Sequence, residues 1–259
     1  MRLPDPSINN APALAFCYAM DFEPGTHGWH AHNRHQLVYA VSGVLQLESE
    51  AGQWLLPPQR AAWVTADKPH LTRYLTPVSL RSICFDPTFP DVPQVDSRVF
   101  SVTPLAREMI VYGMRWGTDR DPDDVKANLF FQTLALLCEE WMADEPSFRL
   151  PRAKTPELAQ AIEYTLENLQ EITIDEVTVA ANLSSRTLRR RMQQETGISW
   201  QKFLHTARMM RAMELLATPE AQVTETALAV GYNSLSAFIR AFTRFTSETP
   251  SHYRQRVQS

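Results

Sequence analysis

AANLSSRTLRRRMQQETG (Ala180–Gly197) and ALAVGYNSLSAFIRAFTRF (Ala227–Phe245) share one layout. Each predicts a short helix of small residues, a tight turn and then a second helix. The turn falls at Asn182 and Leu183 in the first stretch, and Gly231 permits it in the second. Two copies of one layout predict a duplicated structural motif in the second half of the chain.

The two copies also match position by position. Ser184 is placed to cap the second helix of the first copy, and Leu188 and Met192 form its buried pair one turn apart. Phe238 and Phe242 stand fifty residues after this pair. The spacing therefore predicts a duplicated helix-turn-helix.

The remaining face of the first copy is strongly basic, with arginines at Arg186, Arg189 and Arg190. A helix fits the major groove of B-DNA, and side chains near its N-terminus reach base edges, where guanidinium groups pair with guanine. Two such helices about 34 Å apart would enter successive grooves. An isolated RTLRRR run is equally typical of a solvated helix face, so it is the repetition that favours DNA reading.

Four elements of the last hundred residues, from about Thr155 to Arg256, resemble the DNA-binding domain of the AraC/XylS family of transcription regulators. They are ANLSSRTLRRRMQQETGISWQKFL, ARMMRAMELLA, ALAVGYNSLSAFIRAF and TPSHYR. The resemblance implies two three-helix subdomains joined by a long helix at about Trp200–Ala217. The family usually has Phe-Gly before its last TP motif. This chain has Thr246 and Ser247, so no glycine favours a left-handed helix end there.

The resemblance also implies which residues contact DNA. The residues that correspond to base contacts are Arg186, Arg189 and Arg190 in the first reading helix and Leu235, Ser236 and Arg240 in the second. Backbone contacts position a protein without reading sequence. The residues assigned to phosphates, or to no contact, are Thr187, Arg191, Lys202 and Asn233.

The first half of the chain has a different pattern of residue types. From about Ala13 to Phe85, short runs rich in Val, Leu, Tyr and Trp are separated by Gly, Pro, Asn and Asp, which is typical of short antiparallel strands. From Pro104 to Glu145 apolar residues recur every three or four positions, which predicts two helices interrupted by DRDPDD. EPSFRLPRAK, with two prolines and mixed charge, is typical of a linker.

We therefore expect an α+β chain of two domains. Its first part is a cupin-like antiparallel β-barrel with following helices, and its second part is an all-α domain with two helix-turn-helix motifs. The predicted boundaries are 1–100 for a sensor domain, 101–145 for a helical dimerisation region, 146–154 for the linker and 155–259 for the DNA-binding domain.

Residues 13–85 carry the cupin resemblance, through HxHxxHQLVYAVSG, GQWLLPP and AAWVTADKPHLTRY. Metal-binding cupins use two histidines in HxH, a carboxylate and a later histidine, because alternate residues of one strand point into the barrel. His30, His32 and His70 occupy the histidine positions. The carboxylate is missing, and His35 and Gln36 are nearest to its place. A complete site would be all nitrogen, which favours zinc, nickel, copper or iron.

The same residues also permit a pocket without a metal. The histidines have an alternative role in the structure of the barrel or in hydrogen bonding to a ligand. Aromatic residues of this region, among them Trp29, Tyr39 and Trp63, are candidates to line a pocket for a small organic effector. For at least half of the aromatic residues a place in the barrel core is the better interpretation.

The overall charge of −4 hides a split between the two halves. Residues 1–151 carry 12 Lys and Arg against 18 Asp and Glu, whereas residues 152–259 carry 13 against 11. Three widely spaced cysteines indicate neither a disulfide framework nor a CxxC ligand pair, and no apolar signal core begins the chain. We expect a cytoplasmic protein that does not enter a membrane.

These features predict a transcription regulator and not an enzyme. Its expected partners are operator DNA, a small-molecule or metal effector in the barrel, RNA polymerase if it is an activator, and a second copy of the chain paired through residues 101–145. Activation and repression both stay open. The alternatives are a metal-dependent cupin dioxygenase or isomerase with a DNA-binding tail, and a nucleoid protein indifferent to DNA sequence.

Overall fold

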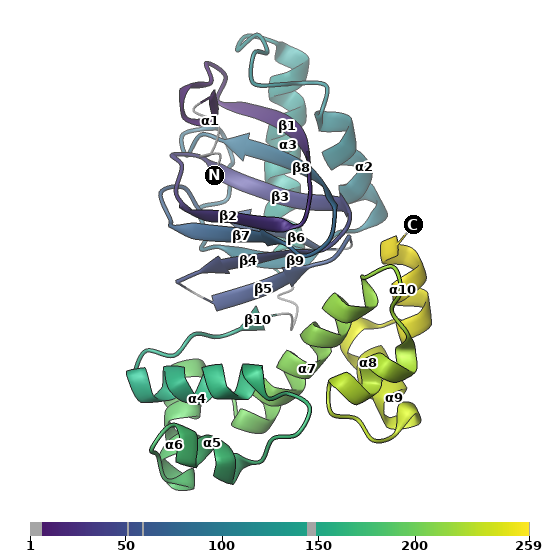
Figure 1. Ribbon diagram of the computed structural model, residues 1–259. Coiled ribbons are helices and arrows are strands. Elements are labelled where there is room, and N and C mark those ends of the chain that lie inside the picture. The colour runs from purple at the N-terminus through teal and green to yellow at the C-terminus, as the bar shows by residue number, and fades with distance from the viewer. Residues whose placement is uncertain (1–6, 51, 59, 144–148, 259) are drawn as a thin grey trace. The chain divides into compact units, whose positions relative to one another are not determined.

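The computed structural model describes residues 7–50, 52–58, 60–143 and 149–258. They form two compact units, the first mostly from residues before 144 and the second mostly from residues after 148 (Figure 1). Strands dominate the first unit and helices the second, which confirms the predicted α+β class. Part of the predicted linker lies outside the described residues, and two linker residues form the short strand β10 (Arg149–Leu150).

Two sheets make up the first unit, preceded by the short helix α1 (Ser7–Asn10). One sheet is antiparallel, in the order β1 (Ala15–Phe22), β8 (Val78–Phe85), β3 (His35–Ser42), β6 (Arg60–Val64) and β9 (Arg98–Ser101). The other contains, in order, β5 (Gly52–Leu56), β4 (Leu45–Ser49), β7 (His70–Tyr74) and β2 (Gly25–His30), and β7 is antiparallel to both neighbours.

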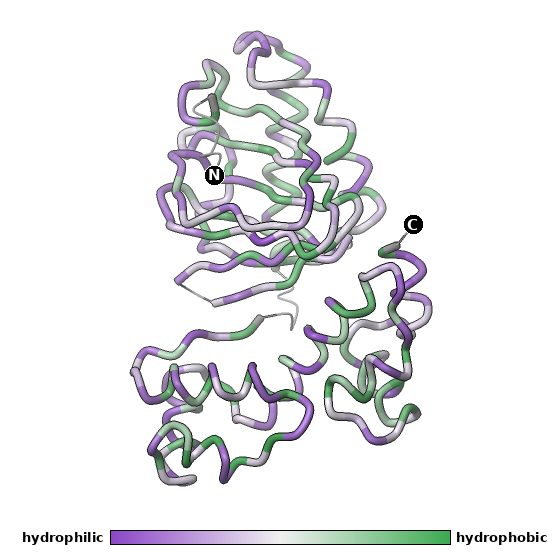
Figure 2. Tube along the Cα trace, viewed as in Figure 1, coloured by the Kyte–Doolittle hydropathy of each residue, from purple (hydrophilic) through white to green (hydrophobic). Residues whose placement is uncertain are grey.

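An apolar core fills the space between the sheets. Val38 and Ala62 come from the first sheet, and Leu47, Trp54 and Tyr74 come from the second. Figure 2 shows hydrophobic segments running through these strands. Because alternate strand residues point to opposite faces, the other face of the first sheet is left for a second core.

The two predicted helices, α2 (Pro104–Gly113) and α3 (Val125–Trp141), cover that outer face. Their apolar residues join Leu37 and Phe85 of the sheet in one buried cluster, which includes Phe131 of α3. The Asp124 side chain begins α3 by accepting hydrogen bonds from the backbone N–H groups of Lys126 and Ala127, so the predicted break at DRDPDD also supplies the cap.

Helices alone make up the second unit from residue 156 onward. They are α4 (Pro156–Glu167), α5 (Ile174–Ala180), α6 (Ser185–Arg191), a π-helical turn (Met192–Thr196), α7 (Trp200–Leu216), α8 (Val223–Ala229), α9 (Leu235–Thr246) and α10 (Pro250–Gln258). The long helix α7 ends within a residue of its predicted limit. The pairs α5–α6 and α8–α9 are the two predicted helix-turn-helix motifs, which are confirmed.

Four residues of the described second unit adopt the left-handed conformation, namely Asn182, Gly197, Gly231 and Ser247, and the last two lie before and after α9. Gly231 has φ +78°, and a Cβ there would lie 2.4 Å from the carbonyl oxygen of Gln170, so the turn between α8 and α9 requires glycine. Ser247 ends α9 with φ +67° and donates its backbone N–H to Thr243. The left-handed end therefore forms without the glycine that is usual in the family.

Replacing Ser247 with glycine is expected to raise the free energy of unfolding by about 0.5–1 kcal/mol, because relief of left-handed strain exceeds the added entropy of the unfolded chain. Urea unfolding followed by far-UV circular dichroism measures the change. Ser251→Gly, the same replacement inside α10, is the control and should gain nothing. Equal or lower stability of the Ser247 variant would contradict the strain.

Candidate nucleic-acid interface and histidine centre

The two expected reading helices, α6 and α9, begin in the same way. The Ser184 hydroxyl accepts the backbone N–H of Thr187 at 3.1 Å, and the Ser234 hydroxyl accepts that of Ala237 at 3.4 Å. The predicted buried pairs, Leu188 with Met192 and Phe238 with Phe242, are all 0% exposed. The caps and the buried pairs therefore stand at equivalent positions of α6 and α9, fifty residues apart in the sequence.

The residues predicted to contact bases gather on the outer faces of these helices. The exposed side chains are Arg186, Arg189 and Arg190 on α6 and Leu235, Ser236 and Arg240 on α9. Arg190 also donates a hydrogen bond to the Gln194 side chain at 3.0 Å. Each helix therefore leaves its predicted set exposed while its apolar pair is buried.

Arg191 lies in a polar network within the second unit. Its guanidinium donates to the Glu157 carboxylate at 2.6 Å and to the Thr155 hydroxyl at 3.2 Å. Glu195, in the π-helical turn, accepts hydrogen bonds from the same hydroxyl and from the backbone N–H groups of Lys154 and Thr155. This network connects the end of α6 to the start of α4, so Arg191 contributes to the position of α6.

The other residues assigned to phosphates differ in their surroundings. The Thr187 hydroxyl lies 2.8 Å from the Ser184 hydroxyl, inside the cap of α6. Lys202 is exposed in the first turn of α7, and Asn233 is exposed just before α9. Lys202 and Asn233 therefore stay accessible to a phosphate backbone.

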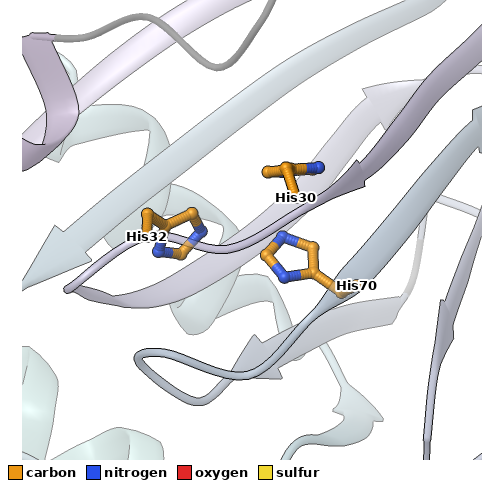
Figure 3. Close-up of side chains that lie close together, drawn as sticks. All are labelled: His30, His32 and His70. Atoms are coloured by element: carbon orange, nitrogen blue, oxygen red, sulfur yellow. The ribbon is translucent and has the colours of Figure 1, made fainter.

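In the first unit, the structure brings His30, His32 and His70 together (Figure 3). His30 ends β2, His70 begins β7, and the two are partners in the ladder between these strands. His32 follows in the segment that leads into β3. One ring nitrogen from each histidine lies within 4.8 Å of the others. We call these three residues the histidine centre.

Backbone carbonyl groups orient all three rings of the histidine centre. Each Nδ1 atom lies 2.7–3.0 Å from a carbonyl oxygen two residues away in the sequence, on Gly28, Arg34 or Lys68. A carbonyl oxygen only accepts hydrogen bonds, so each Nδ1 donates its proton, and the Nε2 of neutral His30 and His70 keeps its lone pair, whereas the Nε2 of His32 faces the side-chain oxygen of Gln36. This is the orientation by which outer groups prepare histidine for metal binding.

Burial lowers the pKa of all three histidines, and it brings the pKa of His70 to about 3. Part of this lowering at His70 comes from the nearby imidazole of His30. The rings are therefore neutral at neutral pH, which is the form in which imidazole binds a metal ion.

Two more side chains border the histidine centre. Gln36 of β3 places its side-chain oxygen 2.9 Å from His32 Nε2. His27 of β2 lies with its ring centroid 4.7 Å from that of His30, and its Nε2 is buried with no hydrogen-bond partner in the described chain. Sequence reasoning missed His27 because strict alternation puts it on the face opposite His30. A register shift between the two removes that alternation.

Comparison with known proteins addresses both units. A family model described as a helix-turn-helix domain matches residues 177–256, and one described as an AraC-like ligand binding domain matches residues 15–92. The chain belongs to the AraC family.

Individual proteins are also similar to this chain. The transcriptional regulator NimR of Escherichia coli (strain K12) is 24% identical over 254 residues, 98% of this chain and 91% of NimR. The transcriptional activator RhaS of Klebsiella pneumoniae (strain 342) is 30% identical over 158 residues, 60% of this chain and 55% of RhaS. The C-terminal domain of AraT from Geobacillus stearothermophilus, a response regulator, is 32% identical with a TM-score of 0.37, covering 39% of this chain and 85% of that domain.

An AraC-family chain with both domains is a transcription regulator that binds DNA, and not an enzyme. The alternative of a cupin dioxygenase or isomerase is therefore set aside. Among the described residues, no helix is both long and apolar enough to cross a membrane.

The structure does not bring the other predicted effector residues of this AraC-family chain to the histidine centre. His35 and Tyr39 point to the face of β3 opposite Gln36, because adjacent strand residues alternate. His35 stacks on Trp63 with centroids 5.4 Å apart, and Tyr39 and Trp63 belong to the core beneath α2 and α3. Trp29 is 49% exposed. A pocket lined by these residues stays a prediction from sequence alone.

Proposed function

We propose that this regulator reads its operator through α6 and α9 and that a divalent transition metal bound at the histidine centre controls that reading. The observation that supports a bound metal is the set of three neutral imidazoles, each held by a hydrogen bond to a backbone carbonyl group. A regulatory metal is also consistent with a ligand-binding domain joined to a DNA-binding domain.

The donor chemistry selects the class of ion. Three imidazole nitrogens suit zinc, copper, iron or nickel, whereas magnesium and calcium prefer oxygen. A metal holds imidazole nitrogen at about 2.0–2.1 Å, so nitrogens within 4.8 Å of one another need shifts of only about 1 Å. Gln36 and His27 are the nearest further donors. A bound ion would link β2, β7 and the segment that leads into β3.

Dialysed full-length protein should bind one Zn²⁺ or Co²⁺ per chain, and His70→Ala should lower that affinity by about 100-fold or more, since loss of even an outer-shell partner costs about 10–100-fold. Calorimetry with Zn²⁺ and the visible absorption of Co²⁺ measure this binding. The matched control is His252→Ala, which removes an exposed histidine of the second unit.

Two results would contradict the metal proposal. One is unchanged metal affinity in the His70 variant. The other is DNA affinity that responds neither to the metal nor to a chelator while metal occupancy changes. An effect of a small organic molecule on DNA binding, with no metal bound, would favour the alternative effector instead.

The proposal includes a homodimer, because apolar side chains remain exposed on the two helices that cover the first sheet. These side chains are Leu105 and Tyr112 on α2 and Val125, Leu129 and Leu136 on α3. Two chains paired through such faces would place two DNA readers on a repeated or inverted operator. Contact with RNA polymerase belongs to the proposal if the regulator activates.

A further inference from the structure

The exposed face of each reading helix consists of two neighbouring rows. Since caps and buried pairs coincide at an offset of fifty residues, α6 and α9 can be compared residue by residue. On a helix, residues four apart are neighbours. The first and fifth residues of each helix therefore make one row, and the second and sixth make the other.

The row of second and sixth residues is polar on both helices. It contains Arg186 and Arg190 on α6 and Ser236 and Arg240 on α9, and all four are exposed. An arginine is thus kept at the sixth position of each helix. Both helices retain one guanidinium in the same place.

The row of first and fifth residues differs in chemistry between α6 and α9. On α6 it contains Ser185 and Arg189, and on α9 it contains Leu235 and Ile239. Leu235 is 41% exposed, and Ile239 is partly exposed beside it. Leu235 lies three residues before Phe238 and so borders the buried face, yet it stays exposed while Phe238 and Phe242 are fully buried. On α9 an apolar row therefore lies where α6 carries an arginine.

Base pairs differ in the chemical groups that they offer to a basic or an apolar row of side chains in the major groove. Guanine offers O6 and N7 to arginine, whereas thymine presents a methyl group to apolar side chains. Building on the proposed DNA reading, we propose that α6 selects guanines and that α9 selects thymine methyl groups through Leu235 and Ile239, next to a guanine read by Arg240. The operator is then asymmetric, with a guanine half for α6 and a thymine-containing half for α9.

Removal of single thymine methyl groups tests this assignment. Selection from a random pool of DNA duplexes with the full-length protein yields an enriched duplex, in which each thymine is replaced singly by deoxyuridine. Wild-type protein should bind about 4-fold more weakly where a contacted methyl is removed, the equivalent of about 0.8 kcal/mol for one buried methyl group. The loss should be confined to one half of the duplex.

Leu235→Ala should bind the thymine and deoxyuridine duplexes equally. The matched control is Leu228→Ala, which truncates a leucine that is 49% exposed but lies on α8, and it should keep the wild-type preference. Equal binding of all deoxyuridine duplexes by wild-type protein, or a preference that survives in the Leu235 variant, would overturn the inference alone. A selection that enriches no sequence would overturn the DNA-reading proposal and this inference with it.

Discussion

Replacing Arg189 and Arg190 together with alanine is expected to weaken specific operator binding by about 2–6 kcal/mol, from about 30-fold to about 25,000-fold. Both side chains are exposed on α6, whereas Leu188 of the same helix is buried. A bidentate contact between arginine and guanine contributes about 1–3 kcal/mol of discrimination, and two contacts are removed. Affinity for an unrelated duplex should fall much less, so that specificity relaxes.

Fluorescence anisotropy at one salt concentration, on an operator duplex and an unrelated duplex, measures both affinities. Lys202→Ala is the contrasting variant, because Lys202 is exposed in the first turn of α7 and is predicted to contact phosphate and not bases. It should weaken binding to both duplexes and reduce the salt slope by up to about one unit. Unchanged operator affinity in the double arginine variant would refute the role given to α6.

Phe238→Ala is expected to lower the free energy of unfolding of the second unit by about 3–5 kcal/mol, because it removes a large side chain from a close-packed core. Phe238 is 0% exposed, and its ring lies between those of Tyr232 and Phe242, with centroid distances of 5.6 and 5.7 Å. A stability of only a few kcal/mol is common for small domains, so this unit is expected to lose much of its helix content.

Thermal and urea unfolding followed by far-UV circular dichroism measure the loss. Phe238→Leu preserves part of the packing and should cost less, so it provides a folded intermediate case. Leu235→Ala lies on the exposed face of the same helix and should change stability by no more than about 0.5 kcal/mol. A cost below about 1 kcal/mol for Phe238→Ala would contradict its place in the core.

Most of the second unit was predictable from its sequence because its signals are local. Ser184 and Ser234 cap helices whose buried residues recur at helical spacing, and Gly231 marks a turn that only glycine fits. The end of α9 was less predictable. Ser247 carries a Cβ and still adopts the left-handed conformation, in which its backbone N–H donates a hydrogen bond to the carbonyl oxygen of Thr243.

The first unit was predictable only in part. Its strand content follows from short apolar runs between turn residues, and its two helices follow from apolar residues at helical spacing. Strand β9 (Arg98–Ser101) was not predicted, and β10 lies inside the predicted linker. Short strands gain their stability from partners distant in the sequence, so local propensity identifies them poorly. The role of the exposed faces of α2 and α3 stays a prediction.

The sequence by itself determined that this chain has two matched helix-turn-helix motifs, because caps, turns and helical periodicity act within a few residues. Only the tertiary structure decided which histidines meet. His30 and His70 become partners through the pairing of β2 with β7, and a register shift brings His27 beside them. His35 stacks on Trp63 instead. Strand register depends on contacts between distant segments, which a pattern of neighbouring residues does not contain.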